Sequence, residues 1–146
     1  MSVELDAWTA FKTASSNSAT LAAYAKTFIY GRKPFIFSPA EHPVFMAWPH
    51  RIPEDNYFTF PKRKMVKLEI VICGIIKNSD VNTREDEILK YDAIIKNAIE
   101  NDITLGGKAI ITNLGSTSLA GIMNEDTVVL QIPAIITLPI LTAGNR

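Results

Sequence analysis

Residues 64–77 read KMVKLEIVICGIIK and form the clearest predicted strand of the chain. In the first half, apolar side chains stand at every second position, at Val66, Leu68, Ile70 and Ile72. That period is typical of a β-strand with one buried face. After Ile70 both faces are apolar, so we expect the strand to pass from a half-exposed to a fully covered position in the sheet.

Residues 83–100, TREDEILKYDAIIKNAIE, form the clearest predicted helix. Thr83 and Asp86 have the spacing of a capping box. The apolar residues recur at helical spacing and predict one buried stripe: Ile88, Tyr91, Ile95, Ala98 and Ile99. Charged pairs four residues apart, each stabilising the helix by about 0.2–0.5 kcal/mol, are expected on the outer face: Asp86 with Lys90, and Asp92 with Lys96.

The rest of the chain predicts a single domain, 1–146, in three parts. Residues 1–30 are an N-terminal helical segment, with helices near 3–14 and 19–27 separated by serines. Residues 31–63 are rich in proline and aromatic residues and predict short strands and a loop. Residues 64–140 form a strand-helix-strand-strand core.

Two further strands follow the helix and complete an α+β fold. They are expected over 108–114 and 127–132, and the second continues over 134–138 after a bulge or bend at Pro133. We predict a mostly antiparallel sheet of four to five strands, with the long amphipathic helix packed on one face. The last strands are too apolar for an edge in water, so a second copy of the chain is expected to pair with them.

The composition of the chain argues against several classes of function. The 15 Lys and Arg residues balance the 15 Asp and Glu residues, so the basic excess of nucleic-acid-binding proteins is absent. The single cysteine, Cys73, excludes an internal disulfide and a Cys-rich metal site. The acidic N-terminus does not resemble a signal peptide. The single cysteine fits an intracellular, reducing site of action. No apolar run reaches the roughly 18 residues of a membrane span, so we expect no membrane partner.

Each candidate for chemistry has an ordinary structural interpretation that we prefer, so we expect no catalytic, cofactor-binding or metal-binding residues. His42 and His50 are too few for a zinc site. Cys73 lies within a predicted buried strand. The remaining candidates lack the required motif spacing or suit a first helical turn: the 102–108 turn, the 114–118 segment, and Glu85, Asp86 and Glu87.

The strongest binding candidate is an aromatic and cationic segment that contains Tyr57, Phe58, Phe60, Lys62 and Arg63. Such residues can stack on nucleic-acid bases, anchor a protein interface, or simply belong to a hairpin with protective charges. With a net charge of zero we prefer a protein interface to nucleic acid. Ile135 and Leu138 of the last strand join the list of interface candidates.

The C-terminal two-thirds of the chain resembles the tail terminator, or tail completion, family of long-tailed bacteriophages. The resemblance covers roughly residues 60–140. It rests on the strand 65–77, the helical phrase DEILKYDAIIKNAI of residues 86–99, Asp102 with the Leu105-Gly106-Gly107 turn, and the strand 127–132. The order of elements is similar too, whereas residues 31–61 match least.

The resemblance implies a structural virion protein without catalysis or cofactors. It implies a ring, expected to be a hexamer, at the head-proximal end of the tail. The ring would cap the tail tube, stop its polymerisation and join the head, so its partners would be other copies of the chain, the tail tube protein and a head-tail connector. The virion would be assembled in the host cytoplasm. The alternatives are a neck or tail-tube subunit of similar fold, or a small-molecule or nucleic-acid binding module.

Overall fold

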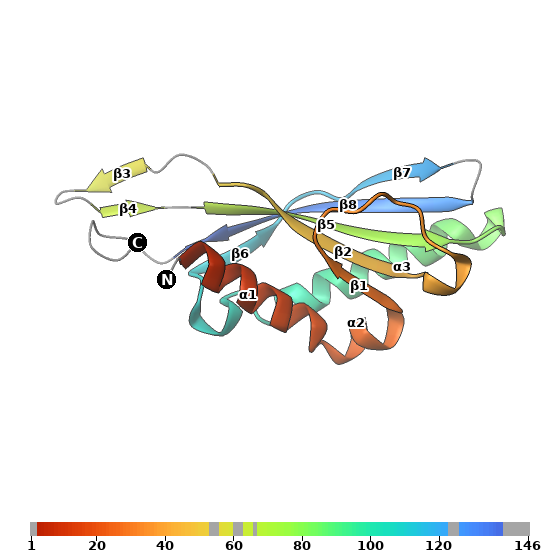
Figure 1. The fold of residues 1–146 in the computed structure, drawn as a ribbon, viewed down its shortest axis with the longest axis horizontal. Coiled ribbons are helices and arrows are strands. Elements are labelled where there is room, and N and C mark those ends of the chain that lie inside the picture. Colours follow the sequence, from red (N-terminus) through yellow and green to blue (C-terminus); the bar gives the residue numbers. More distant parts are fainter. Residues whose placement is uncertain (1–2, 53–55, 60–62, 66, 123–125, 139–146) are drawn as a thin grey trace.

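A computed structural model describes residues 3–52, 56–59, 63–65, 67–122 and 126–138 of the chain. Two short helices come first, five strands follow, and the long helix α3 separates them from the last three strands (Figure 1). In chain order the elements are α1 (Val3–Ser16), α2 (Ala19–Tyr24), β1 (Thr27–Tyr30), the 3-10 helix η1 (Pro39–Glu41), β2 (Val44–Arg51), β3 (Asn56–Thr59), β4 (Arg63–Met65), β5 (Lys67–Lys77), α3 (Val81–Glu100), the 3-10 helix η2 (Leu105–Gly107), β6 (Ile111–Leu114), β7 (Ser118–Ile122) and β8 (Thr127–Thr137).

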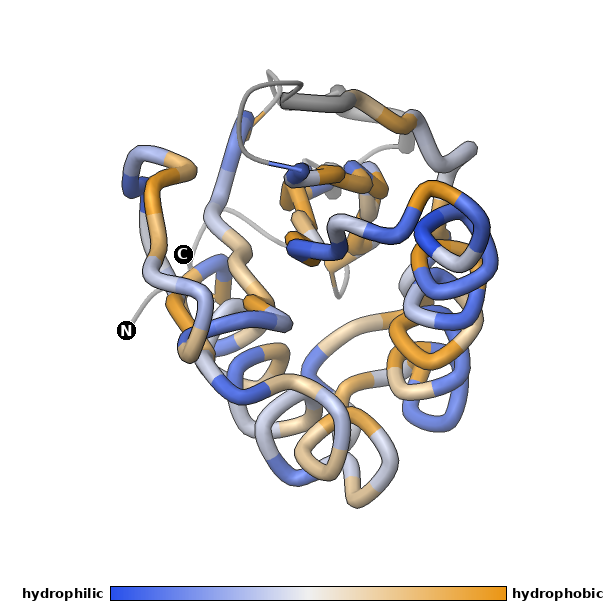
Figure 2. Tube along the Cα trace, turned by 90° about the vertical axis from the view of Figure 1, so that its right-hand side faces the viewer, coloured by the Kyte–Doolittle hydropathy of each residue, from blue (hydrophilic) through white to orange (hydrophobic). Residues whose placement is uncertain are grey.

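One six-stranded sheet organises the domain and confirms the predicted α+β class. The order is β1-β2-β5-β8-β6, and β7 pairs with β8 on the same side as β6. All pairs are antiparallel except β1 with β2. The sheet thus has more strands than the four to five expected. All three helices lie on one side of it (Figure 1), and the strands form the hydrophobic centre of the molecule in Figure 2.

The N-terminal segment is helical up to Tyr24, in two helices as predicted. The Ser18 hydroxyl caps α2 by accepting a hydrogen bond from the Leu21 N–H at 3.4 Å. The second helix ends three residues before the predicted position 27, because Thr27 already belongs to β1, which pairs with β2. Pairing with the sheet therefore overrides the local helical pattern at this boundary.

The predicted apolar stripe of α3 is confirmed, since all five of its residues are buried. The predicted capping box is wrong. The helix begins two residues earlier, and the Asp80 carboxylate accepts a hydrogen bond from the Asn82 N–H at 2.9 Å. Of the two predicted ion pairs only Asp92–Lys96 forms, at 3.1 Å. The Lys90 ammonium lies over the Tyr24 ring instead, 5.7 Å from its centroid.

Tyr91 fixes α3 against the middle of the sheet. It is fully buried, and its hydroxyl donates a hydrogen bond to the Val44 carbonyl of β2 at 2.7 Å. Gly74 of β5 makes room for the ring, because a Cβ at that position would lie 2.8 Å from Tyr91 Cε2. Leu130 of β8 and Ile95 of α3 close the same site, at 3.0 and 3.1 Å from that Cβ position.

The last strand is interior, which corrects two expectations. β8 lies between β5 on one side and β6 and β7 on the other, so its apolar residues are covered within the chain. It also pairs with β5 through Pro133 without a break, so the bulge or bend predicted in this strand is wrong. The apolar sequence of the strand reflects its central position rather than a partner copy.

Pro133 instead coincides with a break in the neighbouring edge. Its carbonyl accepts a hydrogen bond from the Gly115 N–H at 2.7 Å. In an antiparallel strand the N–H and C=O of one residue point to the same side, so the donor that proline lacks faces β6 and β7. There, residues 115–117 oppose only residues 132–133 and form a bulge. A Cβ on Gly115 would lie 2.6 Å from Pro133 Cγ, so the bulge requires glycine.

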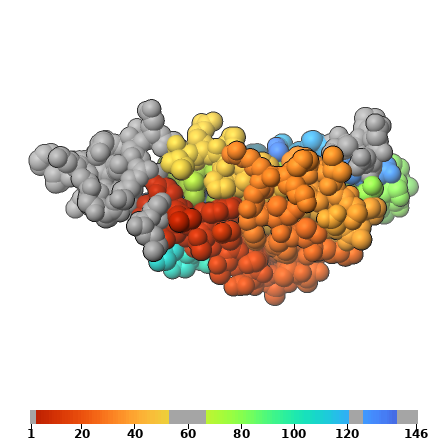
Figure 3. Space-filling view, viewed as in Figure 1, coloured from red at the N-terminus to blue at the C-terminus, as the bar shows by residue number. Residues whose placement is uncertain are grey.

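The second face of the sheet is partly covered by the chain itself. Residues 31–43, which we call the strap, run from β1 to β2, and much of the surface in Figure 3 is made by this orange region. Phe37 of the strap is buried and Phe35 is half-buried. They pack on a second apolar cluster of the sheet: Val44, Met46, Cys73, Ile75 and Val129.

A hairpin extends the ladder of β2 and β5 beyond the body of the domain (Figure 1). It consists of β3 and β4, whose register places Tyr57 opposite Lys64 and Thr59 opposite Arg63. We expected a loop over residues 50–63, where prolines and charged residues hide the strand pattern, and a hairpin was the ordinary structural interpretation of its aromatic and cationic part. The hairpin projects at one end of the long axis, and α3 begins at the other.

Replacing Ile95 by aspartate should unfold the domain. Ile95 is fully buried beneath α3, and a buried unpaired charge costs about 4 kcal/mol or more, a large part of the stability of a typical domain. Leu89→Asp is the matched control, because Leu89 lies on the same helix and is 60% exposed. Thermal melts followed by circular dichroism should show loss of the transition in Ile95→Asp alone. A normal melt for Ile95→Asp would refute the packing of α3.

Candidate assembly surfaces

The cysteine and the carboxylates that were considered as catalytic candidates are buried, hydrogen-bonded within the chain, or exposed on the outer side of a helix. Cys73 is fully buried in β5, and burial raises the pKa of its thiol to about 11, although a hydrogen bond with Gln131 opposes the shift. A thiol with so high a pKa is a poor nucleophile at neutral pH. Glu85 and Asp86 lie on the exposed outer side of α3, while Glu87 accepts hydrogen bonds from Tyr24 and Asn78.

The two histidines do not come together. His42 belongs to the strap and is buried, with Nδ1 2.9 Å from the Ser38 carbonyl and its ring edge-on to Phe37. His50 is exposed near the end of β2. Among the described residues, no group of three or more His, Cys, Asp or Glu side chains is close enough to hold a metal ion. None of the described helices is long and apolar enough to cross a membrane.

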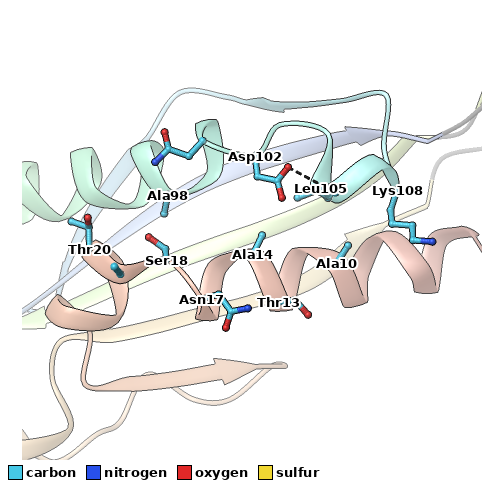
Figure 4. A pocket seen from close by; sticks show the side chains of 13 residues that line it. Ala10, Thr13, Ala14, Asn17, Ser18, Thr20, Ala98, Asp102, Leu105 and Lys108 are labelled. Atoms are coloured by element: carbon cyan, nitrogen blue, oxygen red, sulfur yellow. Dashed lines mark hydrogen bonds between the residues drawn. The ribbon is translucent and has the colours of Figure 1, made fainter.

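A groove of about 610 Å³ lies between α1, the start of α2 and the end of α3 (Figure 4). Small side chains such as Ala10, Ala14 and Ala98 line it, and its two charged residues are Asp102 and Lys108. The Asp102 carboxylate accepts a hydrogen bond from the Gly106 N–H at 3.0 Å and so holds the glycine turn. The groove is large enough for a small molecule, but its one carboxylate, Asp102, already holds the glycine turn.

The predicted interface residues fall into four groups. Tyr57, Phe58 and Arg63 belong to the projecting β3–β4 hairpin, whereas Phe60 and Lys62 lie outside the described residues. Ile135 is half-buried on the second face of the sheet. Leu138 is fully buried in the main core, so it is not available to a partner and we remove it from the interface.

The two edges of the sheet are surfaces that sequence reasoning missed. Within the described part of the chain, β1 pairs only with β2, and β7 pairs only with β8. Neither edge has a charged residue or a proline: β1 reads TFIY, and residues 116–122, which include β7, read STSLAGI. Natural sheets usually protect such edges with charges, prolines or covering segments. Leu119 of β7 is moreover 53% exposed.

The registers place these two edges at the same level of the sheet. One row of paired residues runs from Thr27 through Val44, Ile75 and Val129 to Ala120. β1 runs parallel to β2, and three antiparallel pairings separate β2 from β7. The two edge strands therefore run in opposite directions.

No known family model and no curated protein matches the chain. The surfaces described above are the features of the molecule that bear on its function. They can bind another polypeptide through exposed backbone groups, aromatic residues and charges, and such contacts need no reactive group.

The position of Cys73 predicts that its thiol does not react in the folded protein. At pH 8 a pKa of about 11 leaves roughly a thousandth of the thiol ionised, against about a quarter for an exposed cysteine. A chromogenic disulfide reagent should react at once in denaturant and hardly at all without it. The raised pKa also predicts stability that is full below pH 9 and falls as the pH rises toward 11. Rapid labelling of the native protein would contradict this burial.

Proposed function

We propose that the chain is a structural subunit of a bacteriophage tail that assembles into a closed ring and acts as a tail terminator. The family resemblance supplies the biological setting. The observation that carries the proposal is the pair of uncharged sheet edges at the same level, each of which has no second partner strand among the described residues. Because they run in opposite directions, β7 of one copy can pair with β1 of the next in an antiparallel ladder.

Such a contact joins two different surfaces and is therefore head-to-tail. Head-to-tail contacts form rings when the rotation between neighbours closes, and open filaments when it does not. In such a ring the sheet would continue from one copy to the next. The helices and the hairpin would remain available for contacts with other partners. A tail terminator needs this arrangement, since one ring must stop the tube on one side and receive the head on the other.

The strength of the edge contact can be estimated from its length. β1 has four residues and β7 has five, which allows about four backbone hydrogen bonds of roughly 1 kcal/mol each. A total near 4 kcal/mol corresponds to a dissociation constant of about 1 mM before the entropy of association is considered. Backbone pairing alone is thus too weak, so side-chain contacts between copies must add to it.

A charged residue on the edge should weaken assembly without unfolding the chain. We predict that Leu119→Lys raises the concentration needed for half-assembly by at least about tenfold, because lysine protects sheet edges from pairing. Leu119 is exposed, so the melting temperature should change little. The control is Ile103→Lys, a partly exposed apolar residue of the turn after α3. Light scattering after gel filtration measures the mass of the assembly. Equal masses for Leu119→Lys and wild type at the same concentration would refute the edge contact.

A further inference from the structure

Three aromatic side chains stand beside the β1 edge of the sheet. They are Phe28 and Tyr30 of β1 and Trp8 of α1, and the centroid of the Tyr30 ring lies 6.0 Å from that of Trp8 and 6.4 Å from that of Phe28. Each ring is half-buried and packs on the main core. We call these three residues the aromatic ridge. Aromatic rings that keep part of their surface exposed are frequent anchors of protein interfaces.

Contacts within the chain hold the aromatic ridge in place. The Trp8 ring stacks on the buried Phe11 ring, with centroids 5.7 Å apart. The Tyr30 hydroxyl lies 2.7 Å from Ser15 Oγ and donates a second hydrogen bond to the Lys12 carbonyl at 3.3 Å. Because the rings are already fixed, a partner that covers them causes little further loss of conformational entropy.

The opposite edge of the sheet carries an exposed apolar side chain on the same face. One row of paired residues crosses the whole sheet: Phe28, Phe45, Gly74, Leu130 and Leu119. Paired residues on neighbouring strands point to the same face, and Tyr91 of α3 lies over Gly74, so this is the face that the helices cover. The row begins at the aromatic ridge with Phe28 and ends at Leu119 of β7, which is 53% exposed.

Pairing of two copies through their edges brings the ends of this row together. Because β7 and β1 run in opposite directions, a copy moved sideways along the sheet, without being turned over, pairs antiparallel with the first. The helices of both copies then lie on the same side of the sheet. With the edges at equal level, Leu119 stands beside Phe28 of the next copy. A shift of two residues would place it beside Tyr30, because side chains alternate between the faces.

We infer that the aromatic ridge is the docking site for Leu119 of a neighbouring copy of the chain. The leucine side chain covers the exposed parts of Phe28 and Tyr30, and Trp8 closes the site from the helical layer. Full burial of a leucine side chain strengthens a contact roughly tenfold to a hundredfold. The contact rests on the proposed function, because it requires the edge pairing between copies, and it supplies side-chain interactions that the backbone hydrogen bonds lack.

Truncation of Leu119 tests the contact without adding a charge to the edge. Leu119→Ala leaves the backbone of β7 able to pair, unlike Leu119→Lys. We expect it to need at least about tenfold higher concentration for half-assembly. The matched control is Ile36→Ala, which truncates an apolar residue of the strap that is 75% exposed and should assemble like wild type. Both variants should melt at the temperature of wild type, because both side chains are exposed.

The fluorescence of Trp8 reports on the aromatic ridge itself. The chain has two tryptophans, and Trp48→Phe removes the other one, which packs on the apolar cluster of the opposite face. In this background we expect the emission of Trp8 to shift to shorter wavelength as the concentration rises through assembly, because Leu119 displaces water from the ring. When Leu119→Ala is added and the protein is assembled at higher concentration, the shift should be clearly smaller.

Failure of this contact can be told from failure of the proposed function. If Leu119→Lys blocks assembly while Leu119→Ala assembles like wild type, the edges pair and the docking site is wrong. Equal weakening by Leu119→Ala and Ile36→Ala also overturns the docking site. Assembly with unchanged Trp8 emission would mean that the aromatic ridge stays open in the ring, which refutes the inference and leaves the ring standing. A wild-type chain that stays monomeric up to 1 mM, a limit of roughly three decades above a micromolar contact, overturns both proposals.

Discussion

The contact between Tyr91 and Gly74 fixes the arrangement on which the other surfaces depend. A long helix could cross a sheet in several ways, but the ring of Tyr91 needs the bare backbone of Gly74, and its hydroxyl needs the Val44 carbonyl. Together these constraints place α3 across the central strand and tie it to β2. The apolar side of the helix is then committed to the core, and its opposite side must face outward.

The same core leaves the two edges of the sheet open. The helices cover one face of the sheet and the strap covers part of the other, so most of the apolar centre is buried within one copy. Among the described residues, each edge strand pairs on one side only. Pro133 and Gly115 add a bulge between β6 and β7, and bulges often mark the end of pairing at an edge. Within the described residues, the sheet of one copy ends in β1 on one side and in β6 and β7 on the other, and these are the edges that the proposed contact between subunits would join.

The sequence pattern predicted those elements whose burial imposes a regular spacing of apolar residues. The helix stripe from Ile88 to Ile99 and the alternation in β5 were visible because burial imposes a fixed period on each. The strand β7 was missed because Ser118, Ala120 and Gly121 give neither alternation nor β-branched residues. The start of α3 was misplaced because Thr83 mimics a cap that Asp80 provides.

The candidate surfaces were predicted only in part, because topology decides them. The apolar sequence of β8 was compatible with an edge pairing with a second copy or with a strand between two others, and only the pairing with β5, β6 and β7 distinguishes these. Leu138 was consequently assigned to an interface although it lies in the core. The aromatic and cationic segment was recognised by its composition, whereas the exposed edges β1 and β7 follow only from the order of strands in the sheet.

The most direct test of head-to-tail closure is negative-stain electron microscopy of the purified wild-type chain, over a range of concentrations. The account predicts annular particles of one uniform diameter with a central channel. Tubes that lengthen with concentration would assign the chain to the body of a tail rather than to its end. Single compact particles at every concentration would contradict assembly through the sheet edges.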